Sequence, residues 1–159
     1  MKITALVFAA LMISLAASRA SAQDAEKSAI DKFISVQATR KRGEEYADAR
    51  KVVKGDLNGD DVAETVVLYT IEGENGGNNH VQYLVVFRLN NGKLSYATHT
   101  SVGGKGYRDV DLDSISNRLI NLSTMGYAKN DPGCCPTLKG KAWYRLGNGR
   151  LVELKRPHS

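Results

Sequence analysis

From Ala49 onward the sequence alternates apolar and polar residues with a period of two, and glycine and asparagine interrupt this alternation at short intervals. A period of two places successive side chains on opposite faces of a strand, and Gly and Asn favour the turns between strands. The pattern predicts eight short strands, over residues 50–54, 62–71, 80–89, 93–100, 107–112, 117–125, 140–146 and 150–155. Connections this short favour an antiparallel meander.

Two of the predicted turns have similar sequences around them. Asn90-Asn91-Gly92 and Gly147-Asn148-Gly149 suit the positive φ angles of tight hairpins, and the stretches Phe87–Leu94 and Tyr144–Leu151 resemble each other. We therefore predict an internal duplication that gives two propeller-like blade repeats. The alternative is a chance similarity between two β-meanders.

A helical pattern precedes the strands. Apolar residues such as Ile30, Phe33 and Ile34 follow the helical spacing after Gln23, and the pattern ends by about Thr39. The predicted fold class is therefore α+β, with one N-terminal helix packed on an antiparallel meander of seven or eight short strands.

The first 22 residues have the organisation of a secretory signal peptide. Lys2 is followed by an apolar run, and Ala20-Ser21-Ala22 forms a small-residue cleavage pattern. An uncleaved anchor is the alternative, but the apolar run is shorter than the roughly 20 residues that span a bilayer. We predict a signal peptide over 1–22 and a single domain over 23–159, located in the periplasm or secreted, with no transmembrane segment after cleavage.

Cys134 and Cys135 are the only cysteines, and they are adjacent. Export would place them in an oxidising compartment, where thiols pair. We expect a vicinal disulfide that stiffens one turn, because a bond between neighbours cannot close a long loop. The open alternatives are a redox switch, a pair of thiolate ligands for a soft metal, and a bridge between molecules.

Residues 55–64 place oxygen-bearing groups at alternate positions of one tight loop. The predicted ligands are the side chains of Asp56, Asn58, Asp60 and Glu64 and the main-chain carbonyl of Val62. Hard cations such as Ca²⁺ favour such oxygen ligands. The alternative is a set of Asx-turns, in which Asp56 and Asn58 accept backbone N–H groups and bind no ion.

This loop resembles the D-x-N-x-D-G-x-x-D loops of FG-GAP and VCBS-type extracellular β repeats, which join two strands of a blade and often hold calcium. It is not an EF-hand, because Val67 stands at position twelve and a strand follows. Asp61 replaces the usual glycine, so it must adopt a left-handed or similar turn. Together with the Cys134-Cys135-Pro136 loop, the chain also resembles small exported bacterial proteins of unassigned activity, which implies a periplasmic location.

Gly103-Gly104-Lys105-Gly106 lacks the spacing of a phosphate-binding P-loop and precedes more strand. We interpret it as an exposed loop in which Lys105, Tyr107 and Arg108 contact a partner. Charge is uneven, with nine acidic and four basic residues over 55–113 but two acidic and eight basic over 114–159. An unidentified periplasmic protein or an anionic envelope polymer suits the basic region, whereas no motif indicates nucleic-acid binding.

No catalytic motif surrounds the three histidines. A small hydrolase would need His80 or His99 beside carboxylates in a cleft. We expect a non-catalytic periplasmic or secreted binding module with one calcium-binding loop. The alternative is a periplasmic inhibitor or immunity protein that inserts the 103–108 loop into a cell-wall hydrolase.

Overall fold

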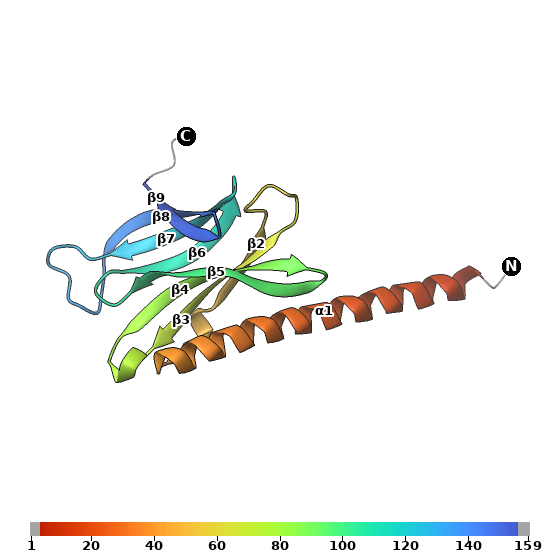
Figure 1. Ribbon diagram of the computed structural model, residues 1–159, viewed down its shortest axis with the longest axis horizontal. Helices are drawn as coiled ribbons and strands as arrows, with labels where there is room; N and C mark the ends of the chain where they lie inside the picture. The colour runs from red at the N-terminus through yellow and green to blue at the C-terminus, as the bar shows by residue number, and fades with distance from the viewer. Residues whose placement is uncertain (1–3, 156–159) are drawn as a thin grey trace.

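The computed structural model describes residues 4–155, with side chains described from residue 22. The side chains of the predicted signal peptide, residues 1–22, therefore lie outside the described residues except at Ala22. The elements are α1 (Thr4–Lys41), β1 (Glu44–Glu45), η1 (Ala47–Ala49), β2 (Lys51–Gly55), β3 (Glu64–Glu72), η2 (Glu74–Gly76), β4 (His80–Asn90), β5 (Lys93–Gly104), β6 (Arg108–Ser116), β7 (Leu119–Gly126), β8 (Leu138–Gly147) and β9 (Arg150–Leu154) (Figure 1). The α+β class and the meander are confirmed, and the eight predicted strands correspond to β2–β9. The two-residue strand β1 was not predicted.

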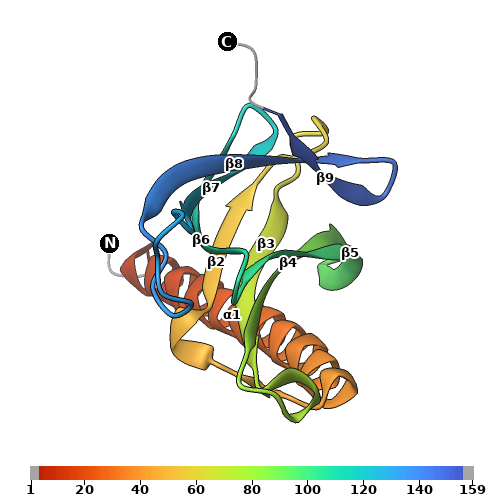
Figure 2. The ribbon, with the colours of Figure 1, turned by 90° about the vertical axis from the view of Figure 1, so that its left-hand side faces the viewer.

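All nine strands belong to one antiparallel sheet that does not close into a barrel. Strands β3 to β9 follow one another in order, and both β1 and β2 pair with β3. Strands β5 and β6 are joined by a single residue pair, Gly104 and Arg108. The sheet bends at this junction, so that β2 contacts β6 and β5 contacts β9 across the interior (Figure 2). The result is two halves, β2–β5 and β6–β9, each with four main strands, and the two-residue β1 is added to the first half at β3.

The main core lies between these halves. Alternate residues of β3 and β4, such as Val66 and Val86, point inward and meet Leu112 and Leu122 of the second half. Because side chains alternate along a strand, every second residue of the predicted apolar runs faces this core. The buried members of this core are Leu57, Val66, Leu68, Leu84, Val86, Val102, Val110, Leu112, Ile120, Leu122, Ala142 and Tyr144.

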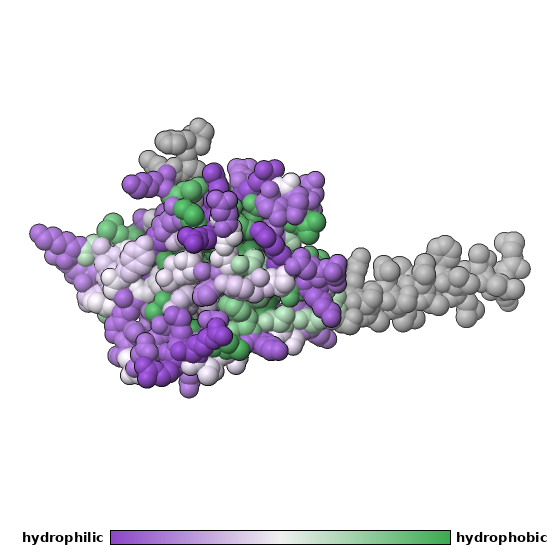
Figure 3. Space-filling model, in the orientation of Figure 1, coloured by the Kyte–Doolittle hydropathy of each residue, from purple (hydrophilic) through white to green (hydrophobic). Residues whose placement is uncertain are grey.

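Helix α1 covers the other face of the first half. Ile30 and Ile34 pack against Val67, Tyr69 and the rest of the alternate set on β3 and β4. The helix runs to Lys41, two residues beyond the predicted end. Polar side chains dominate the face of the domain seen in Figure 3, whereas apolar side chains show along the described part of α1. Strands β3 and β4 are thus buried on both faces, between the helix and the second half.

The two predicted hairpin turns have the backbone that Asn-Gly favours. Asn91 and Gly92 have φ angles of 49° and 74°, and Asn148 and Gly149 have nearly the same values, 49° and 72°. Each half is a four-strand meander with its Asn-Gly turn between the last two strands. This strand order agrees with the predicted blade-like repeats, and the duplication itself stays a prediction.

No helix within the described part of the chain is both long enough and apolar enough to cross a membrane.

Candidate functional site

The acidic loop, residues 55–64, connects β2 to β3 and folds on its own side chains. Asp56 Oδ1 accepts the backbone N–H groups of Asn58 and Gly59. Asn58 Oδ1 then accepts the N–H of Asp60 at 2.8 Å, and Asp60 Oδ1 accepts that of Val62 at 2.9 Å. Each polar side chain therefore satisfies a donor two or three residues ahead, as in consecutive Asx-turns.

Glu64 attaches the acidic loop to the sheet. Its side chain is 4% exposed, with Oε2 accepting the Leu57 N–H and Oε1 accepting Asn58 Nδ2, both at 2.8 Å. The Nε of Arg88 lies 3.8 Å from Oε1. A buried carboxylate needs such donors, so Glu64 is the residue on which the loop conformation depends.

Asp61 has the left-handed backbone that its place in the loop requires, with φ of 63°. Gly59, with φ of 86°, lies against the guanidinium of Arg118. A side chain at this position would collide with that guanidinium, since an added Cβ would overlap the Arg118 Cζ. The N–H of Gly59 is also the main cause that lowers the pKa of Asp56, with smaller contributions from Asn58, Asp61 and Arg118. The loop anion is thus stabilised by the protein's own donors.

The predicted calcium ligands lie in one loop, but their side-chain oxygens accept hydrogen bonds from the loop itself and do not surround an open cation site. Asn58 Nδ2 donates to Asp60 Oδ2 at 2.9 Å and to Glu64 Oε1, so a donor stands where a cation needs an oxygen. Among the described residues no group of three or more His, Cys, Asp or Glu side chains could hold a metal ion. The observed bonds match the Asx-turn alternative, and calcium binding by Asp56, Asn58, Asp60, Val62 and Glu64 stays a prediction.

Three loops meet at the opposite end of the sheet, which we call the loop end: residues 73–79, 105–107 and 127–137 (Figure 1). Hydrogen bonds connect them. Lys105 Nζ donates to the Asn78 carbonyl, and the N–H of Gly106 donates to the Tyr127 hydroxyl at 3.5 Å. The predicted partner loop is therefore one part of a larger composite surface.

The three predicted contact residues differ in their surroundings. Lys105 is exposed, and Tyr107 is 59% exposed. Arg108 instead donates to both carboxylate oxygens of Glu153, to the Tyr144 hydroxyl and to the Val102 carbonyl, which leaves its side chain 13% exposed. Its guanidinium carbon lies 4.7 Å from the centre of the Tyr107 ring. Arg108 thus fixes the end of the 105–107 loop to β9 and packs against the ring of Tyr107.

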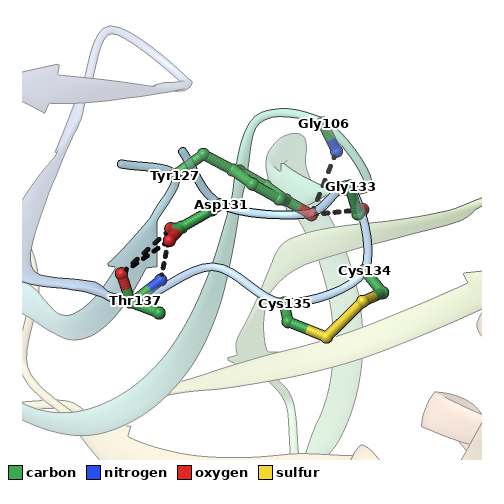
Figure 4. Close-up of a disulfide and its surroundings, with 7 residues drawn as sticks. All are labelled: Gly106, Tyr127, Asp131, Gly133, Cys134, Cys135 and Thr137. Atoms are coloured by element: carbon green, nitrogen blue, oxygen red, sulfur yellow. Dashed lines mark hydrogen bonds between the residues drawn. A yellow bond between two sulfur atoms is a disulfide. The ribbon is translucent and has the colours of Figure 1, made fainter. Parts of the chain in front are cut away.

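The cysteine loop, residues 127–137, is ordered by Asp131. One oxygen of this carboxylate accepts the N–H groups of Ala128 and Thr137 at 2.7 and 2.8 Å. Figure 4 shows the bond to Thr137 and the bond from the Tyr127 hydroxyl to the Gly133 carbonyl, which is 3.0 Å long. The N–H of Ala128 is the main cause that lowers the pKa of Asp131.

The tip of the cysteine loop carries the predicted vicinal disulfide. Cys134 and Cys135 are joined to each other, and both are exposed. The bond and the Asp131 contacts stiffen the same short loop.

The two internal histidines have different partners. His80 Nε2 lies 2.9 Å from Asp109 Oδ1, at a partly exposed position. His99 Nδ1 lies 2.9 Å from the Tyr96 hydroxyl, and burial is the main cause that lowers its pKa. In the described part of the chain, no serine, threonine or cysteine side chain bonds to either imidazole. The His80–Asp109 pair was not predicted, because the two residues lie on different strands and no motif joins them.

No protein-family model, curated protein or solved structure matches this chain. The resemblance to FG-GAP and VCBS-type loops therefore depends on the acidic loop alone.

Proposed function

We propose that this protein is a non-catalytic binding module of the periplasm or extracellular space, and that its loop end contacts the partner. The observation that carries this proposal is the support given to Tyr107. Its ring is 59% exposed, yet its own N–H donates to the Gly104 carbonyl and the next residue, Arg108, binds Glu153 of β9. An exposed aromatic side chain on an ordered loop loses little conformational entropy on binding, which suits an interface anchor.

The charge of the loop end indicates the chemistry of the partner. Lys105 and Lys129 are exposed there, Lys139 is exposed just beyond it in β8, and no ion pair among the described residues joins a carboxylate to any of the three. The loop end also contains the carboxylates of Glu74 and Asp131, but Glu74 accepts the Tyr83 hydroxyl and lies 3.7 Å from Lys41, and Asp131 accepts hydrogen bonds within the cysteine loop. An acidic protein surface or an anionic envelope polymer complements this arrangement.

The site geometry supports binding in preference to catalysis. The carboxylates of Asp56 and Asp60 accept backbone N–H groups of their own loop, and Arg108 forms an ion pair with Glu153 within the sheet. The His80–Asp109 pair has an imidazole and a carboxylate, but a hydrolase of the serine or cysteine type would also need a nucleophile bonded to the imidazole.

Quantitative capture from an extract of the native compartment tests the proposal. We expect the protein to retain a partner at constant stoichiometry, and we expect Tyr107→Ser to reduce retention at least about ten-fold, as for an interface anchor. Leu89→Ser is the matched control, because Leu89 is 51% exposed at the other end of the sheet. Equal retention by the Tyr107 and Leu89 variants would refute binding through the loop end.

The narrow tip formed by Lys105, Gly106 and Tyr107 also favours a second candidate, the inhibitor of a cell-wall hydrolase. An added Cβ on Gly106 would meet nothing within 4 Å, so Gly106 faces open space at this tip. This candidate requires the captured partner to be a single hydrolase whose activity falls on binding. Loss of inhibition in Tyr107→Ser would support it, whereas a captured polymer or a fully active enzyme would exclude it.

A further inference from the structure

The end of the domain opposite the loop end contains a polar cavity of about 490 Å³. It is lined by residues of the acidic loop, of β4, of β8 and of the turns that join β6 to β7 and β8 to β9. Figure 1 shows where these segments lie in the fold. Leu57 and Leu146 contribute apolar groups to its lining, and Asn58, Asn117 and Asn148 contribute polar groups. We call this cavity the arginine pocket.

Three arginines from separate parts of the chain line this pocket. Arg88 belongs to β4, Arg118 to the turn between β6 and β7, and Arg145 to β8. None of the residues that line the pocket is acidic. A guanidinium presents several donors in a planar fork that matches the oxygens of carboxylates and phosphates.

The nearest carboxylates leave part of this positive charge without a partner. Glu64 lies 3.8 Å from Arg88, but its oxygens accept hydrogen bonds from Leu57 and Asn58. Arg118 contributes to the lowered pKa of Asp56, whose oxygens also accept backbone N–H groups. No ion pair or hydrogen bond of the described residues engages Arg118 or Arg145 through its guanidinium.

We propose that the arginine pocket binds a phosphate group, with Arg118 and Arg145 as its principal donors and Arg88 as a third. A tetrahedral phosphate offers oxygens in several directions and can accept from three guanidinium groups, whereas a carboxylate is filled by one or two. The group can belong to a small phosphate ester or to a phosphate-bearing polymer. The pocket and the loop end lie at opposite ends of the domain, so this proposal does not depend on the proposed function.

Calorimetric titration of the full chain with inorganic phosphate at low ionic strength tests the proposal. We expect saturable binding that weakens about ten-fold in Arg118→Gln and in Arg145→Gln, and that also weakens as salt is added. Arg40→Gln, which removes an exposed arginine on α1, should bind like the unmodified protein. Thermal melting of all variants establishes that each is folded.

Further titrations identify the source of the phosphate group. Glycerol phosphate represents a small ester, and polyphosphates of increasing length represent a polymer. Affinity per molecule that rises with chain length assigns the pocket to a polymer, and equal affinity for the ester and the longest chain assigns it to a small ligand. No saturable binding of inorganic phosphate, or equal weakening by Arg40→Gln, would overturn the proposal.

Discussion

Replacing Glu64 by glutamine tests the structural role of the acidic loop. The buried carboxylate of Glu64 accepts one hydrogen bond on each oxygen, from the N–H of Leu57 and from Asn58 Nδ2. Glutamine has nearly the same shape but offers one oxygen and one NH₂ group. Whichever way its amide turns, one of the two donors must face another donor.

The expected cost follows from these two bonds. A hydrogen bond to a charged group contributes about 1.5–3 kcal/mol, and the bond that remains becomes a weaker neutral one. Arg88 adds little, because its side chain is 45% exposed. We expect Glu64→Gln to lower the free energy of unfolding by about 2–3 kcal/mol, which corresponds to a fall in Tm of roughly 6–9 °C for a domain of this size.

Urea unfolding followed by the fluorescence of Trp143, the single tryptophan, measures this change. Asp60→Asn is the matched control within the same loop. Its new amide can still accept the Val62 N–H, although its NH₂ group then faces Asn58 Nδ2. Because Asp60 is exposed, water can solvate these donors, so the cost should stay below about 1 kcal/mol. A loss below about 0.5 kcal/mol for Glu64→Gln, or equal losses for both variants, would refute the reasoning.

Four further predictions concern the same scaffold. Ile34→Ala should cost about 3 kcal/mol in urea unfolding, because Ile34 is fully buried between α1 and the sheet. Asp61→Gly should raise stability by roughly 0.5–1 kcal/mol, since Asp61 has a positive φ. EGTA should shift the Tm of the unmodified protein by less than about 1 °C, whereas Asn58→Asp should become calcium-dependent because an acceptor replaces the donor between Asp60 and Glu64. Acidification should loosen the cysteine loop, which amide hydrogen exchange at Ala128 and Thr137 measures. The pKa of Asp131 is lowered in the folded protein, so its hydrogen bonds are fully present above the ordinary value of 3.8 and are lost as the pH falls below it.

Each of these predictions has a contradicting result. A cost below about 1 kcal/mol for Ile34→Ala would contradict the packing of α1, and destabilisation by Asp61→Gly would contradict the strained turn. A large effect of EGTA on the unmodified protein would show that calcium holds the acidic loop, as the sequence predicts, and that the Asx-turns alone do not. Exchange at Ala128 and Thr137 with no change beyond the intrinsic pH dependence of amide exchange would contradict the role of Asp131.

The strands could be predicted because most of them bury alternate residues, and that alternation is visible in sequence. Gly103 and Gly104 were instead expected in a loop, yet they belong to β5. An added Cβ on Gly103 would lie 2.8 Å from the Arg108 carbonyl oxygen, and one on Gly104 would lie 2.6 Å from that of His80. These glycines permit a close approach of backbones, which sequence cannot distinguish from a turn. Val62 was expected to begin a strand but belongs to the acidic loop, because its N–H bonds to Asp60.

The candidate sites were predictable only where their residues are close in sequence. The turn bonds of Asp56 and Asn58 and the Cys134–Cys135 bond are local, so residue type and spacing indicated them. The arginine pocket is assembled by the bend between the two halves of the sheet, which no local pattern reveals.

A photo-crosslinking amino acid placed at position 107, in cells that export the protein, tests the central claim most directly. Binding through the loop end predicts one predominant crosslinked product from position 107 and none from position 89, which is similarly exposed at the other end. Products of equal yield from both positions, or no product from position 107, would contradict the account.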